Sequence, residues 1–335
     1  MRFRLLIGAI SALLAAGAGI PAAAQQSPPH ALNVIVFPGG FNLPIWAAER
    51  QGFFEQNGVK VSLINTPGSV FQMQGLAEGR FDIAITAIDN VIAYQEGQGE
   101  AKIPDNPDMF VFMGADNGFL SLVVGPGVKS FADLKGKKLS VDALTTGYAF
   151  VLRELVTRNG IAESEVTYER AGGVFNRFQE LVKGTHAGTM LITPFDILAT
   201  ARGHARLAKA QEQLGAYQGL VGAARRSWAQ QNERALVGFI RAYHAGVTFL
   251  YEPKNREIAE ALLVANVRAM TPQLGRQSLE VLLHEKSGFF KDVAVDVRGV
   301  ETVLRLRSKF GEPRKSLTDP AKYVDLSYRR KAMGP

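Results

Sequence analysis

The chain has 335 residues, 47 % of them hydrophobic, a formal net charge of +7 and no cysteine. The length and composition allow one large globular domain or two of moderate size, each with its own core. The absence of cysteine excludes disulfides, zinc or iron–sulfur sites with Cys ligands, thiol nucleophiles and a lipid anchor on an N-terminal cysteine. The basic charge leaves nucleic-acid binding open as a first question.

Residues 1–24 have the pattern of a secretory signal peptide. Two arginines precede an apolar run over residues 5–20, and three alanines at 22–24 follow it. The run has 16 residues, fewer than the roughly 20 that a membrane-spanning helix needs. We therefore expect export and cleavage rather than a membrane anchor, with the formal charge lowered from +7 by the loss of the two arginines.

After a polar segment at residues 25–30, strand and helix patterns alternate. Short apolar or alternating runs predict strands, and apolar residues at helical spacing predict helices. The expected elements are a strand over 32–37, a helix over 43–56, a strand over 59–64, a helix over 68–76, a strand over 81–85 and a helix over 89–94. This order predicts an α/β fold with a mostly parallel sheet that helices cover on both faces.

The alternation begins again after a loop at 104–107. The expected elements are strands over 109–113 and 121–124, a capped turn at 130–134, a strand over 138–141, a helix over 145–159, a strand over 166–168, a helix over 175–183, a strand over 189–192 and a helix after Asp196. In the capped turn, Asp133 is placed to accept a backbone N–H. Helical spacing dominates from Trp228 onwards, and predicts helices over 228–250, 258–264, 274–284 and 297–310.

Two lobes of similar structure are expected because the order of elements repeats. One motif repeats with it, at Leu76, Gly79, Thr86 and Asp89 and again at Leu181, Gly184, Thr193 and Asp196. We expect a first lobe built from residues 31–124 and 214–315, a second lobe over 125–213, and a tail over 316–335.

Candidate binding residues lie where the predicted strands end, because ligands of open α/β sheets bind beyond the carboxyl ends of the strands. Several of these loops also begin helices, where free backbone N–H groups point outwards. The candidates are Phe41, Asn42, Trp46, Ser69, Thr86, Asp89, Asp116, Asn117, Thr145, Thr146, Gly147, Phe175, Thr193 and Asp196. The alternative is that these residues only form turns and caps, and that Trp46 belongs to the core.

The charge of these loops bears on the ligand. They carry four acids, Asp89, Asp116, Asp142 and Asp196, but hardly any Arg or Lys. An oxyanion site usually recruits Arg or several helix amino termini. Acidic and aromatic loops therefore favour a neutral or amine-bearing ring as the ligand.

Enzymatic and metal-binding patterns are weak. None of the five histidines lies two to four residues from another, and neither a Gly-x-Ser-x-Gly elbow nor a phosphate-binding Gly-rich loop occurs. Basic runs at 135–138, 225–226 and 329–331 lack the interleaved aromatics of a nucleic-acid surface. We expect no catalytic residue, no metal ligand, no cofactor and no nucleic-acid partner.

Four segments carry a resemblance to a known family: PGGFNLPIWAAE at 38–49, QGFFEQNGV at 51–59, GLAEGRFDIA at 75–84 and FADLKGKK at 131–138. The chain is similar to the exported solute-binding proteins of ABC importers for nitrate, sulfonates, taurine and thiamine-type pyrimidines. The resemblance implies a two-lobe periplasmic-binding-protein fold, type II-like, in which a hinge closes the lobes on a small-molecule ligand. It also implies delivery to an inner-membrane permease with a cytosolic ATPase.

The same resemblance implies pocket positions at Phe41, Asn42, Ser69, Thr86, Asp89, Thr145 and Thr146. We expect a periplasmic monomer without a lipid anchor and without enzymatic activity. The favoured ligand is a neutral or amine-bearing ring such as a pyrimidine.

Two departures disfavour the nitrate and sulfonate branches. Residues 184–187 lack the acid of the Gly-x-x-Asp turn, and bulky Phe41 replaces a small residue. Pyrimidine-forming enzymes of the wider family need cysteines, which this chain lacks. The alternatives are an exported enzyme on the same scaffold and a ligand-sensing partner of a membrane receptor.

Overall fold

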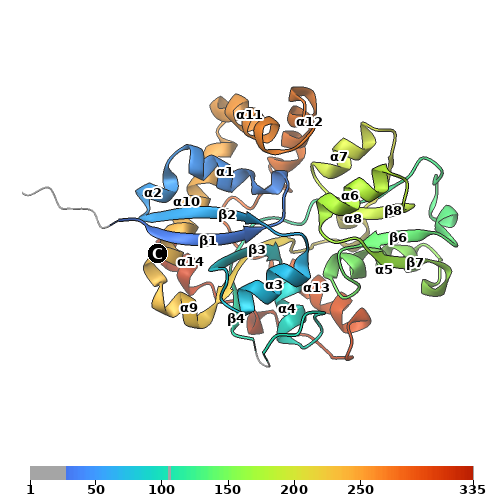
Figure 1. Ribbon diagram of the computed structural model, residues 1–335, viewed down its shortest axis with the longest axis horizontal. Coiled ribbons are helices and arrows are strands. Elements are labelled where there is room, and N and C mark those ends of the chain that lie inside the picture. The colour runs from blue at the N-terminus through green and yellow to red at the C-terminus, as the bar shows by residue number, and fades with distance from the viewer. Residues whose placement is uncertain (1–27, 105–106, 335) are drawn as a thin grey trace, which may run out of the picture.

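The computed structural model describes residues 28–104 and 107–334, which form two lobes, each built around a five-stranded sheet (Figure 1). The signal peptide expected at residues 1–24 lies outside the described residues. None of the helices within the described ranges is both long and apolar enough to cross a membrane.

Lobe I contains a sheet in the order β2-β1-β3-β10-β4. Its strands are β1 (His30–Val36), β2 (Val59–Asn65), β3 (Ile83–Ala87), β4 (Met109–Gly114) and β10 (Leu220–Arg225). The first three strands pair in parallel, and β10 lies antiparallel between β3 and β4. Every residue of β3 and β4 is buried, as expected for strands that are covered on both faces.

Lobe II repeats this arrangement in the order β7-β6-β8-β5-β9. Its strands are β5 (Leu120–Val124), β6 (Lys138–Val141), β7 (Thr167–Arg170), β8 (Gly188–Ile192) and β9 (Ala205–Lys209). Here β5 is the reversed strand, antiparallel to β8 and β9. In both lobes the reversed strand is the first strand after the chain has crossed from the other lobe. The predicted α/β fold of two similar lobes is confirmed, with one antiparallel insertion in each sheet.

The boundary between the lobes differs from the expected position. Because β5 pairs only with strands of lobe II, the chain crosses between β4 and β5 and not after residue 124. It returns between β9 and β10, around the expected residue 213. We call residues 115–119 and 215–219 the crossing segments. They lie side by side, since the Gly219 N–H donates to the Asp116 carbonyl at 2.9 Å.

Helices cover both sheets (Figure 1). In lobe II they are α5 (Gly147–Arg158), α6 (Val174–Val182), α7 (Phe195–Thr200) and α8 (Ala210–Leu214). The others are α1 (Leu43–Arg50), α2 (Phe53–Gln56), α3 (Ser69–Ala77), α4 (Ile88–Gln95), α9 (Arg226–Gln231), α10 (Glu233–Tyr251), α11 (Arg256–Asn266), α12 (Pro272–Leu282), α13 (Val297–Phe310) and α14 (Ser327–Met333).

Local signals explain several boundaries. The helix expected over 43–56 is divided into α1 and α2 by Gly52, whose φ of 70° belongs to the left-handed region. The capped turn at 130–134 forms as predicted, because the Asp133 carboxylate accepts the Ser130 N–H at 2.9 Å.

Helix α13 lies between the lobes, in contact with α4 of lobe I and α5 of lobe II. Its amino end rests on a crossing segment. The Asp296 N–H donates to Gln218 Oε1 at 2.8 Å, and a Cβ on Gly299 would lie 2.4 Å from the Gln218 nitrogen. The helix therefore begins at the point where the two lobes are joined.

Candidate functional site

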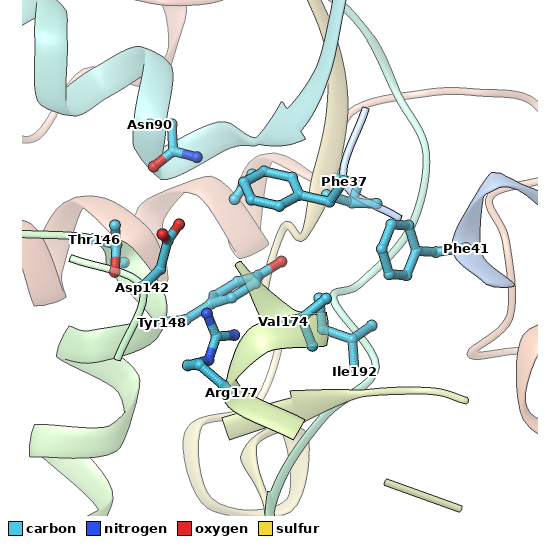
Figure 2. A pocket seen from close by; sticks show the side chains of 12 residues that line it. Phe37, Phe41, Asn90, Asp142, Thr146, Tyr148, Val174, Arg177 and Ile192 are labelled. Atoms are coloured by element: carbon cyan, nitrogen blue, oxygen red, sulfur yellow. The ribbon is translucent and has the colours of Figure 1, made fainter. Parts of the chain in front are cut away.

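A small cavity lies between the lobes (Figure 2), with about 30 Å³ open to the centre of a water-sized sphere. Lobe I contributes Phe37, Phe41, Ala87, Asn90 and Leu220, and lobe II contributes Asp142, Thr146, Gly147, Tyr148, Val174, Arg177 and Ile192. The carboxyl ends of β1, β3, β6 and β8 and the first turns of α4, α5 and α6 meet there. This is the place predicted by the rule for open α/β sheets.

One wall of the cavity is apolar and comes from Phe37, Phe41, Val174 and Ile192. The Phe41 ring lies over Gly39, where a Cβ would stand only 2.3 Å from a ring carbon. Asn42 fixes the same loop, because its Nδ2 donates to the Phe37 carbonyl at 2.7 Å. The Phe-Pro-Gly-Gly-Phe-Asn segment at residues 37–42, after β1, thus presents two aromatic rings to the cavity.

The opposite wall is polar, and Tyr148 stands between the two walls (Figure 2). The Asp142 carboxylate accepts the Ser69 N–H across the cleft, with distances of 3.0 and 3.3 Å. Burial raises the pKa of Asp142. Asn90 also lines this wall, and its Nδ2 donates to Thr86 Oγ1 at 2.9 Å.

Arg177 brings a buried positive charge to the cavity. Its guanidinium donates to the carbonyls of Gly172 at 2.9 Å and Met190 at 3.2 Å. Among the described residues no carboxylate lies within ion-pair distance of it, although Asp142 acts on it at longer range. Burial lowers the pKa of Arg177. Its remaining N–H groups are available to a bound molecule, because two carbonyls satisfy only part of the five-donor fork.

The Tyr148 hydroxyl is a polar group at the cavity that has no hydrogen-bond partner among the described residues. Within the described ranges it is buried and forms no hydrogen bond, and burial raises the pKa of Tyr148 well above 10.0. A buried hydroxyl without a partner carries a desolvation cost. A solute that accepts from or donates to this group would remove that cost.

The structure places some of the predicted site residues at the cavity and others away from it. Phe41, Thr146 and Gly147 line the cavity. Asn42, Ser69, Thr86 and Thr145 lie one contact away: they bond to lining residues, or in the case of Thr145 directly precede one. Four other predicted residues do not line the cavity. Trp46 packs on the core, and the Phe175 ring packs on the Phe195 ring with centres 5.9 Å apart. Asn117 donates to the Ser287 carbonyl, and Thr193 is buried at the cis bond before Pro194.

The three acids predicted to line the pocket are placed elsewhere. Asp89 forms a two-point ion pair with Arg307, at 2.7 and 2.8 Å. Asp196 pairs with Arg206 at 2.6 Å. The Asp116 carboxylate accepts the N–H groups of Gly118 and Leu220. None of the three is a cavity-lining residue, so the acidic cleft expected from the loops is corrected to a cavity with one carboxylate and one guanidinium.

Arg177 is the most consequential residue that sequence reasoning missed. It is the fourth residue of α6, on the face that Val174, Phe178 and Leu181 bury. A charged residue within an apolar i, i+3, i+4, i+7 pattern is the signal that marks it.

The comparisons with known proteins agree with this architecture. A sequence model of the family described as NMT1/THI5 like matches residues 42–256. Among solved structures, a protein of Bordetella bronchiseptica RB50 has a TM-score of 0.75 at 20 % identity, over 90 % of this chain and 96 % of that chain. No curated protein sequence matches significantly.

Two further structures share the fold. The ligand-binding component of an ABC-type import system from Staphylococcus aureus, with zinc bound, has a TM-score of 0.72 at 12 % identity, over 90 % of this chain and 99 % of that chain. The alkanesulfonate-binding protein SsuA from Xanthomonas axonopodis pv. citri, bound to MOPS, has a TM-score of 0.68 at 14 % identity, over 85 % and 93 %.

Proposed function

We propose that this chain, which belongs to the NMT1/THI5-like family, is the exported solute-binding component of an ABC importer. The observation that carries the proposal is the cavity whose walls come from both lobes. A solute held there contacts both lobes at once and so stabilises their closed arrangement. After removal of its signal peptide, the protein would capture the solute in the periplasm as a monomer and deliver it to an inner-membrane permease.

The favoured solute is a small neutral or amine-bearing ring such as an aminopyrimidine. The rings of Phe37 and Phe41 offer flat apolar surface for its faces. Asp142 is placed to accept from a ring amino group, and Arg177 to donate to a ring nitrogen or carbonyl oxygen. Because the lining contains one cation, Arg177, and one carboxylate, Asp142, a neutral ring adds no further buried charge.

Arg177 is the lining residue that suits an oxyanion such as nitrate or a short alkanesulfonate, but two other features of the lining suit these anions less well. Either anion would bring a second negative charge near Asp142, and its small body would leave the two phenylalanine rings without contact. These compounds therefore serve as the contrast in a binding screen.

A thermal-shift screen with follow-up calorimetry on the exported chain, residues 25–335, tests the proposal. The panel contains pyrimidines, aromatic amines, aromatic acids, alkanesulfonates and nitrate. We expect the largest stabilisation from rings that offer both a donor and an acceptor. Tightest binding of nitrate or a sulfonate would refute the ring assignment, and turnover of a bound compound would refute the binding-protein assignment.

Three variants connect the best compound of the screen to the cavity. Asp142→Asn and Arg177→Gln should each weaken the binding of this compound at least about tenfold, because each loses a charge-assisted hydrogen bond. Arg206→Gln is the matched control, because Arg206 lies in lobe II outside the cavity lining. Equal losses in all three variants would show that the effect is not local to the cavity.

A further inference from the structure

Arg307 of α13 joins the two lobes from outside the cavity. The guanidinium is fully buried. It donates to both carboxylate oxygens of Asp89, to Gln98 Oε1 at 3.0 Å and to the Thr145 carbonyl at 2.5 Å. Asp89 and Gln98 belong to lobe I and Thr145 to lobe II, so one side chain holds groups of both lobes.

These contacts lie next to the cavity wall. Thr145 is followed by Thr146 and Gly147, which line the cavity at the amino end of α5. Gly147 touches Asp89 directly, since a Cβ at position 147 would stand 2.4 Å from the Asp89 Cγ. The position of this wall relative to lobe I is thus set at the Arg307 guanidinium.

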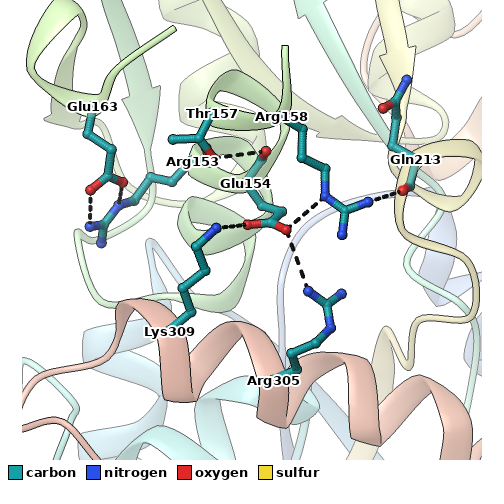
Figure 3. Close-up of polar contacts among 8 residues, drawn as sticks. All are labelled: Arg153, Glu154, Thr157, Arg158, Glu163, Gln213, Arg305 and Lys309. Carbon is teal, nitrogen blue, oxygen red and sulfur yellow. Dashed lines mark hydrogen bonds and ion pairs between the residues drawn. The ribbon is translucent and has the colours of Figure 1, made fainter. Parts of the chain in front are cut away.

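A second group of contacts between α13 and α5 lies further along the helices (Figure 3). The Glu154 carboxylate of α5 accepts from Lys309 at 2.7 Å and from Arg305 at 3.5 Å. The Phe310 ring packs on the Phe150 ring with centres 5.9 Å apart. Both contacts pair α13 with lobe II.

Helix α13 itself is fixed to lobe I. Besides the Asp89 pair, the chain after it is held by Gln98, whose Nε2 donates to the Pro313 carbonyl at 2.7 Å. Lys315 donates to Glu96 at 3.1 Å. The bonds from α13 to α5 are therefore bonds between the lobes, and a rotation of lobe II away from lobe I would break them.

We propose that Arg307 is a positioning residue that holds the lobes together independently of solute. It fixes the amino end of α5, and with it the Thr146–Gly147 wall, against lobe I. Solute contacts then add to an association that the protein already makes by itself. The inference extends the proposed function but does not depend on which solute binds.

Distance measurement between spin labels tests the proposal without any solute. The chain contains no cysteine, so Lys60→Cys in lobe I and Lys183→Cys in lobe II provide two specific labelling positions, both exposed. We expect a single narrow distance distribution in the parent protein. Arg307→Lys keeps a cation beside Asp89 but loses the guanidinium that donates to both Asp89 oxygens. It should shift the distance distribution to longer distances and broaden it, while unfolding stays cooperative.

The matched control is Arg206→Lys. Arg206 pairs with Asp196, the counterpart of Asp89 in the repeated motif, but this pair lies entirely within lobe II. The distance distribution of the Arg206→Lys variant should equal that of the parent protein. An unchanged distribution in folded Arg307→Lys, or an equal shift in Arg206→Lys, would overturn the proposal.

Gly147→Ala is a second variant that leaves Arg307 in place. The added methyl group collides with Asp89 across the lobe boundary and should produce the same shift to longer distances. If Arg307→Lys does not fold, Gly147→Ala provides the test. An unchanged distance distribution in Gly147→Ala would then refute the role of the α4–α5 contact in holding the lobes together.

Discussion

Asp116 is a buried carboxylate at the junction of the two lobes, and its replacement by asparagine should stabilise the protein above neutral pH. Its Oδ1 accepts the N–H groups of Gly118 at 2.7 Å and Leu220 at 3.0 Å. Its Oδ2 is buried without a partner among the described residues. Burial, only partly offset by the two backbone bonds, raises the pKa of Asp116 from 3.8 to about 6.

The size of the effect follows from that pKa. A rise of about two units, at 1.36 kcal/mol per unit, corresponds to about 3 kcal/mol. Because the folded state favours the protonated form, the contribution of Asp116 to stability is complete below pH 3.8 and is lost as the pH rises through about 6. Asparagine keeps the Oδ1 acceptor and never ionises. The Asp116→Asn variant should therefore match the parent near about pH 4 and exceed it by up to about 3 kcal/mol near about pH 8.

Urea unfolding of both proteins across this pH range measures the difference, and contributions from all other carboxylates cancel in it. Asp133→Asn is the control of opposite sign. Hydrogen bonds from Lys129 and Ser130 lower the pKa of Asp133, so its contribution is present at neutral pH and lost as the pH falls. A difference for Asp116→Asn that stays constant with pH would refute the reasoning.

Two further variants address the ion pairs of α13. Asp89→Ala should lower the free energy of unfolding by about 3–5 kcal/mol, because it leaves the Arg307 guanidinium buried without its carboxylate. Chemical denaturation measures this change, and a loss below about 1 kcal/mol would contradict the account. Glu154→Gln should lower the melting temperature at low ionic strength. In high salt most of this decrease should disappear, because the cationic partners Lys309 and Arg305 are about half exposed and salt screens them. A decrease that does not depend on salt would contradict this explanation.

The parts of the fold that were predicted correctly are those with local signals. Strands such as β3 and β8 are apolar runs bounded by turns, and the capped turn at Asp133 carries its own partners within four residues. Strand β10 was not predicted, because its sequence LVGAAR combines small residues that fit several structures. Its place is set by β3 and β4, and a Cβ on Gly222 would stand 2.5 Å from the Phe112 ring.

The candidate site shows the same limit. The rule for strand ends located the cavity, and Phe41, Thr146 and Gly147 line it. The rule could not tell which acids were already paired, because the partner of Asp89 lies 218 residues later in the chain. Asp89 and Asp196 occupy equivalent positions in the two lobes, and each is paired with an arginine from another element.

The reversed strands also determine the order in which the lobes can fold. All five strands of lobe II lie within residues 120–209, so its sheet is complete once that continuous stretch is available. The sheet of lobe I has a gap between β3 and β4 until β10 arrives, and β10 comes more than a hundred residues after β4. Contacts of such long sequence separation form slowly. We therefore expect the second lobe to fold first. The amino-terminal half of lobe I then keeps an exposed sheet edge until β10 pairs with β3 and β4, and we expect this half to need the most protection from aggregation.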